Sequence, residues 1–342
     1  MNKPATIKDI AKQLNVSIST VSRAMRNAPD VNNETKKAVM ALAEELNYQP
    51  NRLALSLRQK QTHTIGVIVP NLDYVLSMMV RGIDEVALEA RYTVMVCQSN
   101  ESFGREIVNT RRLLESLVDG FIISVSSETK SFEHFKKIQE RGIPMIVFDR
   151  TTPHLTAPTV HLDNEEGGFM ATEHLLEQGY KRIAILAGPK NLGISNSRMD
   201  GYMNALKKYK IKPDPTLMIH CDFNQDYAYF ATEELLAMKK KPDAIFAISD
   251  RMGIGASLAI KKKGLSMPDD IALVSFNNEP IVSLVTPGIS SVEMPSFEMG
   301  KAAAKLFIET MHHPEDMSGV ERIFKPKLFI RESSQKSLVK KL

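Results

Sequence analysis

The chain has 342 residues, of which 43% are apolar and 25% are charged. That length suggests two or three domains, and the composition excludes a disordered, collagen-like or disulfide-rich protein. Cys97 and Cys221 lack any metal-ligand spacing, so we expect no metal and no cofactor. The first residues lack the apolar segment of a signal peptide, and no run approaches the roughly 18 apolar residues of a membrane span. We therefore expect a cytoplasmic protein with no membrane partner.

The excess positive charge is concentrated at one end of the chain. Residues 1–62 hold 10 Lys and Arg against 5 Asp and Glu, whereas the remainder holds 34 against 35. A small basic module ahead of a near-neutral body predicts an anionic partner for the module, with nucleic acid first among the candidates.

Three short helices are predicted before residue 50. Thr6 followed by Asp9 is typical of a capped helix start, and Ser17 and Asn32 are placed to cap a second and a third helix. The second helix should end near residue 26 and the third near residue 46. We expect the third helix to bury an apolar face made of Ala38, Leu42, Ala43 and Leu46.

The second of these helices carries hydroxyl and guanidinium groups and no acidic residue on its polar face. Two helices joined by a tight turn, with such a face on the second, predict a helix-turn-helix that enters the DNA major groove; a merely solvated face is the alternative. Arginine reads guanine and small groups read thymine, so base reading is assigned to Ile18, Ser19 and Arg23. Groups near helix N-termini can hold phosphates, and the candidates are Thr6, Ser17, Thr20, Ser22 and Asn32.

A short helix is predicted to follow this module of residues 1–50. It spans about eight residues from Asn51 to Arg58 within a linker, residues 51–62. Because an isolated helix of that length is unstable in water, we expect it to order only when something packs against it. A linker helix packed on the body of the protein is the alternative.

From residue 63 to about 332, short apolar runs alternate with longer amphipathic stretches. This alternation predicts parallel sheets covered by helices on both faces. Two such series predict two doubly wound α/β lobes with a cleft between them. The apolar runs lie at 65–69, 93–97, 120–125 and 145–148 in the first series, and at 183–187, 217–221, 244–248 and 271–276 in the second.

Ligands of such sheets bind beyond the carboxyl ends of the strands. The residues there are carboxylates, amides, an arginine and one aromatic ring, a mixture that suits a polyhydroxylated ligand. Capping of the following helix is the alternative role for an Asp at such a position. The candidates lie in residues 71–76, where Leu76 is singled out, and at Asp149, Arg198, Phe223, Ser249, Asp250 and Asn277.

Two stretches closely resemble the lac-repressor (LacI/GalR) family of bacterial transcription regulators. They read ATIKDIAKQLNVSISTVSR at 5–23 and LNYQPNRLALSL at 46–57. Residues 160–168, 174–184, 198–202 and 269–277 look like the family's effector domain, which is similar to periplasmic sugar-binding proteins. The division that we expect is lobe one at about 63–160 and 296–322, lobe two at about 161–292 and 323–332, and a solvated tail at 333–342.

The resemblance implies a regulator, and in particular a repressor, of a carbohydrate-use operon. It implies a homodimer that binds palindromic operator DNA and answers to a small sugar or sugar derivative. Two hinge helices would pair over the minor groove, with a leucine wedged into the central base step. That role falls on Asn51, Arg52, Ala54 and Leu57, while Arg198 and Asn277 would meet the effector across the cleft, with Phe223 and Asp149 beside it.

Two departures from the family bear on the ligand. Asn277 stands where many sugar-responsive members have aspartate, and Val75 and Leu76 stand where members often have an aromatic pair. One carboxylate fewer favours an anionic ligand such as a sugar acid or a sugar phosphate. A non-sugar metabolite such as a nucleobase is an alternative, as is a stand-alone sugar-binding protein, which the DNA-binding module disfavours. The chain has no nucleotide-binding or hydrolase motif, so no catalysis is expected.

Overall fold

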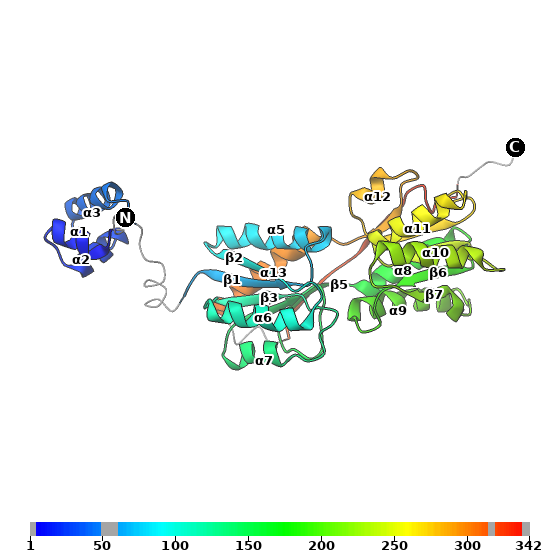
Figure 1. The fold of residues 1–342 in the computed structure, drawn as a ribbon, viewed down its shortest axis with the longest axis horizontal. Coiled ribbons are helices and arrows are strands. Elements are labelled where there is room, and N and C mark those ends of the chain that lie inside the picture. The colour runs from blue at the N-terminus through cyan, green and yellow to red at the C-terminus, as the bar shows by residue number, and fades with distance from the viewer. Residues whose placement is uncertain (1–4, 49–60, 314–318, 337–342) are drawn as a thin grey trace. The chain divides into compact units, whose positions relative to one another are not determined.

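A computed structural model of the chain describes residues 5–48, 61–313 and 319–336. The chain divides into two compact units, residues 1–62 and 63–342, and each is described by itself (Figure 1). The described residues of the smaller unit form three helices: α1 (Ile7–Gln13), α2 (Ile18–Met25) and α3 (Asn33–Glu45).

The predicted helix starts of the smaller unit are confirmed. The Ser17 hydroxyl accepts a hydrogen bond from the backbone N–H of Thr20 at 3.0 Å, and the Asn32 side chain accepts one from the N–H of Glu34 at 2.8 Å. The N–H and the hydroxyl of Thr6 both donate to the carboxylate of Asp9, at 2.8 and 2.7 Å. These bonds satisfy N–H groups that a helix leaves unpaired at its start.

The buried face of α3 differs from the prediction by one residue. Val39 and Ala43 are buried, with Leu42 and Leu46 partly buried, whereas Ala38 is exposed. Residues 39, 42, 43 and 46 follow the spacing of a single helix face, and Ala38 is rotated off it. This face packs on a small core that also includes Ile10 from α1 and Val21 from α2.

The larger unit contains two six-stranded sheets with helices packed against them (Figure 1). The first sheet has the order β11-β5-β4-β3-β1-β2, and all its pairings are parallel. Helices α5 (Tyr74–Glu89) and α13 (Ser296–His312) pack together, as do α6 (Phe103–Glu115) and α7 (Glu133–Glu140). Its strands are β1 (Thr64–Val69), β2 (Thr93–Gln98), β3 (Gly120–Ile123), β4 (Met145–Phe148), β5 (Thr159–Leu162) and β11 (Glu321–Phe324).

The second sheet repeats this plan in the order β12-β10-β9-β8-β6-β7, and only its edge strand β12 is antiparallel. Helix α8 (Asn164–Glu177) packs on α9 (Gly193–Lys208), and α10 (Gln225–Ala237) packs on α11 (Asp250–Lys262). Two short helical segments, η1 (Pro215–Leu217) and α12 (Ile281–Leu284), complete this lobe. Its strands are β6 (Ile183–Ala187), β7 (Met218–His220), β8 (Ala244–Ala247), β9 (Ala272–Asn277), β10 (Ser290–Glu293) and β12 (Lys327–Phe329).

The chain passes between the two sheets three times. It leaves the first sheet after β5 at Leu162, returns to it from β10 through α13, and leaves it again after β11 at Phe324. The expected boundaries at residues 160 and 322 therefore lie two residues before these strand ends. Strands β5, β10, β11 and β12 were not among the predicted apolar runs because they are short and, except for β10, partly exposed.

The expected start of a solvated tail at residue 333 is wrong. Ser333 and Ser334 are buried. The Ser333 hydroxyl donates to the carbonyl of Leu273 at 2.6 Å, and the Ser334 hydroxyl lies 2.8 Å from Nε2 of His174. The ordered part of the second lobe thus extends through residue 334, held by side-chain hydrogen bonds that composition cannot reveal.

Two features are absent within the described ranges. None of the helices there combines the length and the apolar character needed to cross a bilayer. The same residues contain no cluster of three His, Cys, Asp or Glu side chains that could hold a metal ion.

Candidate functional site

The three residues assigned to base reading lie together on the outside of α2. Ile18, Ser19 and Arg23 are all exposed, and Ile18 keeps 45% of its surface in solvent although it is apolar. The opposite side of the helix buries Val21 and Ala24. The smaller unit therefore presents an exposed apolar group, a hydroxyl and a guanidinium on one short helix, which are the groups that read base edges.

An acidic residue that sequence reasoning missed pairs with the key arginine. Nη2 of Arg23 lies 2.8 Å from Oδ2 of Asp30, in the turn before α3. Both side chains are about half exposed, so the pair is weak and can exchange for another partner. Base reading by Ile18, Ser19 and Arg23 stays a prediction.

Most of the side chains assigned to phosphate contacts hold helix ends in the structure. The hydroxyls of Ser17, Ser19 and Thr20 form a chain of hydrogen bonds at 2.7 and 2.8 Å. The carbonyl of Ser22 accepts from Nε of Arg26 at 3.2 Å, and Thr6 and Asn32 act as caps. A phosphate role for these residues stays a prediction. The hinge residues Asn51, Arg52, Ala54 and Leu57 lie outside the described residues, and their roles stay predictions too.

The larger unit has a cavity of about 1130 Å³ at the carboxyl ends of the strands of both sheets. Its walls bring together side chains that are far apart in the sequence, as expected for paired α/β lobes. Six of the seven candidates line it: Leu76, Asp149, Arg198, Phe223, Ser249 and Asn277. The seventh, Asp250, does not.

Asp250 holds neighbouring backbone and hydroxyl groups together and does not line the cavity. Its buried carboxylate accepts hydrogen bonds from the hydroxyls of Ser275 and Ser291 and, at 2.6 Å, from the backbone N–H of Glu279. Burial raises the pKa of Asp250 to about 7, against the lowering effect of these three donors. Asp250 is the first residue of α11, and its side chain points into the sheet toward Ser275 and Ser291. Its neighbours Ser249 and Arg251 line the cavity.

Arg198 is fixed by neutral partners on three sides. Its Nε donates to Oδ1 of Asn164 at 2.8 Å, its Nη1 donates to the carbonyl of Ile248 at 2.6 Å, and its guanidinium lies 3.6 Å from the centre of the Phe276 ring. Only 2% of the residue is exposed, and burial lowers the pKa of Arg198 to about 10. Asn164 was not predicted, although its place one residue after Asp163 at the end of β5 fits the strand-end rule.

Close helix packing sets the position of Arg198 on α9. A Cβ atom placed on Gly168 of α8 would lie only 2.2 Å from the backbone oxygen of Arg198, and one on Gly201 of α9 would lie 2.1 Å from that of Glu165. These two glycines let the helix backbones touch. The arginine backbone is therefore held against α8 while its side chain reaches the cavity.

The cavity wall contains several backbones in the left-handed region. Asp149 has φ 61°, Phe223 has φ 52° and Asn277 has φ 113°, and Asn100 and Glu101 have φ 54° and 60°. Such conformations are uncommon for residues other than glycine and gather at ligand sites. Burial also raises the pKa of Asp149, against the nearby charges of Arg150 and Arg198, so the charge of this carboxylate is costly to bury.

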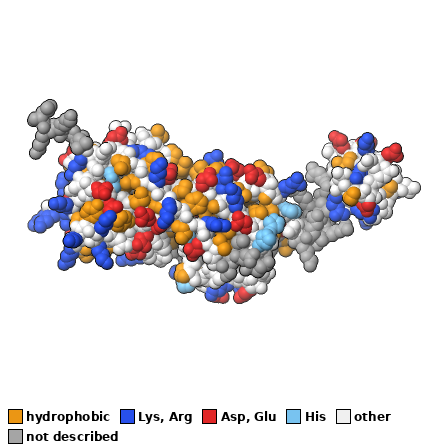
Figure 2. All heavy atoms as spheres, turned by 180° about the vertical axis from the view of Figure 1, so that it is seen from behind, with side chains coloured by type: hydrophobic (Ala, Val, Ile, Leu, Met, Phe, Trp, Pro, Cys, Tyr) orange, Lys and Arg blue, Asp and Glu red, His pale blue; other side chains and the backbone are white. Residues whose placement is uncertain are grey.

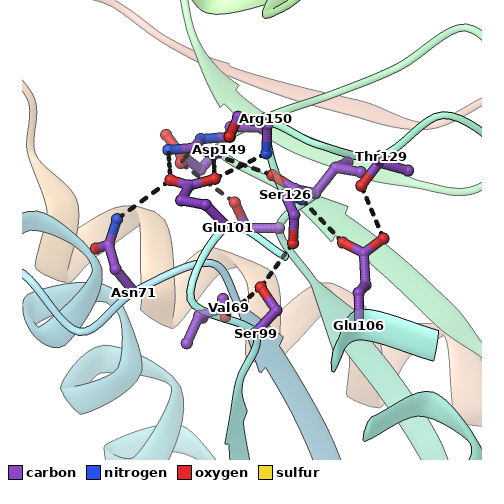
Figure 3. A network of polar contacts seen from close by, with 12 residues as sticks. Val69, Asn71, Ser99, Glu101, Glu106, Ser126, Thr129, Asp149 and Arg150 are labelled. Atoms are coloured by element: carbon purple, nitrogen blue, oxygen red, sulfur yellow. Dashed lines mark hydrogen bonds and ion pairs between the residues drawn. The ribbon is translucent and has the colours of Figure 1, made fainter. Parts of the chain in front are cut away.

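A partly buried ion pair in the wall was missed by sequence reasoning. Nη1 and Nη2 of Arg150 each lie 2.8 Å from one carboxylate oxygen of Glu101, and Arg150 Nη1 also donates to the carbonyl of Val125 at 3.2 Å (Figure 3). Glu101 accepts a further bond from the backbone N–H of Ser127 at 2.7 Å. Burial raises the pKa of Glu101, but Arg150 and Ser127 together leave it below its usual range. Both residues follow strand ends, β2 and β4, where the strand-end rule could have found them.

Two contacts join the lobes across the cavity. Nη1 of Arg251 on α11 lies 2.6 Å from Oδ2 of Asp73, which precedes α5, and the side-chain amide of Asn191 donates to the carbonyl of Ser127. Arg251 and Asp73 are 55% and 44% exposed, so solvent screens their attraction and the pair adds little to closure.

Comparison with known proteins agrees with this arrangement. Residues 6–51 match the family of bacterial regulatory proteins named after lacI, and residues 172–334 match a periplasmic binding protein-like domain. The ribose operon repressor of Halalkalibacterium halodurans is 32% identical over 332 residues, which is 96% of this chain and 97% of that protein. The transcriptional repressor CytR of Escherichia coli K12 is 31% identical, over 97% of this chain and 96% of its own length.

The fold is likewise similar to a solved repressor. The lac repressor dimer bound to operator and the anti-inducer ONPF superimposes with a TM-score of 0.87 at 25% identity, over 97% of this chain and 99% of that one. The named relatives are transcriptional regulators rather than enzymes. The chain belongs to the LacI family of bacterial regulatory proteins, with an N-terminal helix-turn-helix unit and a two-lobed α/β effector domain.

Proposed function

We propose that this protein is a cytoplasmic transcriptional repressor of a carbohydrate-use operon. It binds a palindromic operator as a homodimer, and a small sugar or sugar derivative in the cleft changes its affinity for DNA. The observation that carries the proposal is the cavity of about 1130 Å³, lined by polar side chains of both lobes, in a chain that also bears the exposed face of α2.

The chemistry of the cavity supports a polyhydroxylated ligand. Asp149 and Asn277 offer oxygen acceptors, Arg198 offers donors, and the ring of Phe223 offers a flat apolar surface for a sugar face. A relative that is named a ribose operon repressor points the same way. A nucleobase or nucleoside is the alternative, since the same ring and amide would serve a flat heterocycle.

Exposed apolar residues on the first lobe support association of two copies. Strand β2 is the edge of its sheet, and its residues Met95 and Val96 are exposed, as are Leu72 and Tyr74 near the start of α5 and Leu88 near its end. Apolar side chains are interleaved with charged ones over the surface of the larger unit (Figure 2). An open sheet edge with apolar side chains is a surface that proteins usually cover.

Coupling between cleft and operator rests on the linker at residues 51–62. A helix of about eight residues is ordered only when a partner packs against it. A change in the distance between the first lobes of the two protomers therefore alters the folding equilibrium of this helix. Coupling free energies of about 1–3 kcal/mol correspond to changes of roughly 5- to 150-fold in operator affinity. Leu57→Ala should weaken operator binding and reduce DNA bending without changing ligand affinity.

The test uses the full-length protein. An operator is selected from random DNA, its symmetry is read by footprinting, and its affinity is measured with and without sugars, nucleosides and nucleobases that shift the thermal midpoint. A twofold symmetric footprint and a ligand-dependent change of at least about fivefold support the proposal. A ligand that occupies the cleft and leaves operator affinity unchanged would contradict it, as would equal bending by the Leu57→Ala variant in a phasing assay.

A further inference from the structure

The charge lining the cavity is predominantly acidic. Seven carboxyl groups face four basic groups among the described lining residues. A net negative wall disfavours a negatively charged ligand, most strongly where solvent is excluded. The acidic residues are Asp73, Glu101, Glu128, Asp149, Asp222, Asp226 and Glu279, and the basic residues are Lys130, Arg150, Arg198 and Arg251.

Two of the four basic groups are already paired with acidic residues of the wall. Both terminal nitrogens of Arg150 are paired with the Glu101 carboxylate at 2.8 Å, and Arg251 is paired with Asp73 at 2.6 Å. Recognition of a phosphate or carboxylate by arginine usually takes both terminal nitrogens. Arg150 cannot offer that fork to a ligand while Glu101 holds it.

The other two basic groups do not replace it. Arg198 donates hydrogen bonds from Nε to Asn164 and from Nη1 to the carbonyl of Ile248, and its positive charge attracts the nearby buried Asp149. Lys130 is exposed, so water and salt screen its charge. Water and salt screen the exposed Glu128, Asp222 and Asp226 in the same way, whereas Glu279 is partly buried and forms no ion pair in the described part of the chain.

Glu101 is fixed in place by its surroundings. Besides Arg150, the backbone N–H of Ser127 donates to it at 2.7 Å, and its own carbonyl accepts from the N–H of Glu128 at 3.3 Å. The adjoining Ser126 is tied by its N–H to the buried carboxylate of Glu106 at 2.9 Å, and by its hydroxyl to Ser99 (Figure 3). Glu101 therefore cannot swing aside for an incoming anion without breaking this network.

We infer that the cleft takes an uncharged effector and rejects sugar phosphates and sugar acids, and that Glu101 determines this selectivity by occupying the guanidinium fork of Arg150. This inference rests on the proposed function, because it names the class of ligand for the same cavity. The neutral Asn277 suggested an anionic ligand, because one carboxylate is missing at that position. Such a ligand is not expected, since the cavity wall contains several other carboxylates that the sequence did not place there.

The experiment compares matched ligands on the full-length protein by calorimetry. The pairs are ribose with ribose 5-phosphate, glucose with glucose 6-phosphate and with gluconate, and uridine with uridine monophosphate. For the wild type, the uncharged member should bind at least about tenfold more tightly than its anionic partner. In Glu101→Gln, which removes the charge and keeps the shape, the ratio of anionic to uncharged affinity should rise by about tenfold or more.

A matched control removes the same charge elsewhere. Glu85 on α5 is about half exposed, pairs with Lys301 at 3.0 Å and does not line the cavity, so Glu85→Gln should leave the affinity ratio within about twofold. Tighter wild-type binding of any anionic member, or an unchanged ratio in Glu101→Gln, overturns the inference. If an anionic ligand binds more tightly and also alters operator affinity, the proposed function stands and only the inference fails. If an uncharged ligand binds more tightly but leaves operator affinity unchanged, the inference stands and the proposed function fails.

Discussion

The substitution Arg198→Lys tests how the structure prepares the cavity. It keeps the positive charge of the side chain but replaces a planar fork by a single ammonium group. Arg198 now satisfies two acceptors in different elements, Asn164 at the start of α8 and Ile248 after β8, while it stacks on Phe276 of β9. A lysine can reach one acceptor and cannot stack in the same way.

The loss of stability in Arg198→Lys follows from one hydrogen bond and one ring contact that lysine cannot make. One hydrogen bond to a charged group contributes about 1.5–3 kcal/mol. The stacking of a cation on a buried ring adds about 0.5–2 kcal/mol. Allowing for partial replacement by the ammonium group, we expect a loss of roughly 2–4 kcal/mol in the free energy of unfolding. Ligand affinity should fall by at least about tenfold, because the donor array in the cavity is displaced.

Urea unfolding of the full-length variant, with calorimetry of a cleft ligand, measures both effects. Arg322→Lys is the control, since Arg322 is 55% exposed and its pair with Glu309 spans 3.5 Å. We expect the control to stay within about 0.5 kcal/mol of the wild type. Equal stabilities for Arg198→Lys and the control, with unchanged ligand affinity, would refute the assignment of Arg198 as a buried organiser of the site.

Three further predictions concern recognition, packing and pH. Arg23→Ala should relax base preference at one position of each half-site, at a cost of roughly 1–3 kcal/mol in operator binding; an unchanged selected sequence would contradict it. Gly168→Ala brings a Cβ within 2.2 Å of the backbone of Arg198, so it should cost about 1–3 kcal/mol by urea unfolding and weaken ligand binding. The control Gly104→Ala, whose Cβ would meet nothing closer than 3.9 Å on α6, should stabilise by about 0.5–1 kcal/mol; equal effects at the two glycines would argue against the close helix contact. Burial raises the pKa of Asp250 to about 7 in the folded protein, so its contribution to stability is largest at low pH and is lost as the pH rises through about 7. The stability of the wild type relative to Asp250→Asn should therefore fall between about pH 4 and 7, and a difference that rises over this range would contradict the assignment.

Local signals predicted much of the architecture. Helix caps depend on residues three or four positions apart, so Ser17 and Asn32 were identified correctly from sequence alone. Continuous apolar runs marked six buried strands, because a strand covered on both faces has no polar side, and they also marked the partly exposed edge strands β2 and β7. The rule that ligands bind at strand ends placed Asp149 and Arg198, with four other candidates, around one cavity. Whether these residues bind an effector stays a prediction.

The tertiary structure decided which partner each polar side chain takes. Asp250 fits the strand-end pattern, yet it turns into the sheet because Ser275 and Ser291 supply its hydrogen bonds there. Glu101 and Arg150 are 49 positions apart, and they come within 2.8 Å only because β2 and β4 end at the same edge of the folded sheet. A side chain's hydrogen-bond partners are chosen by proximity after folding, and proximity across tens of residues leaves no local periodicity in the sequence. Local residue patterns therefore predicted the helix starts, most of the strands and the strand ends that carry polar groups, whereas the ion pairs of the cavity wall form only once distant segments have folded together.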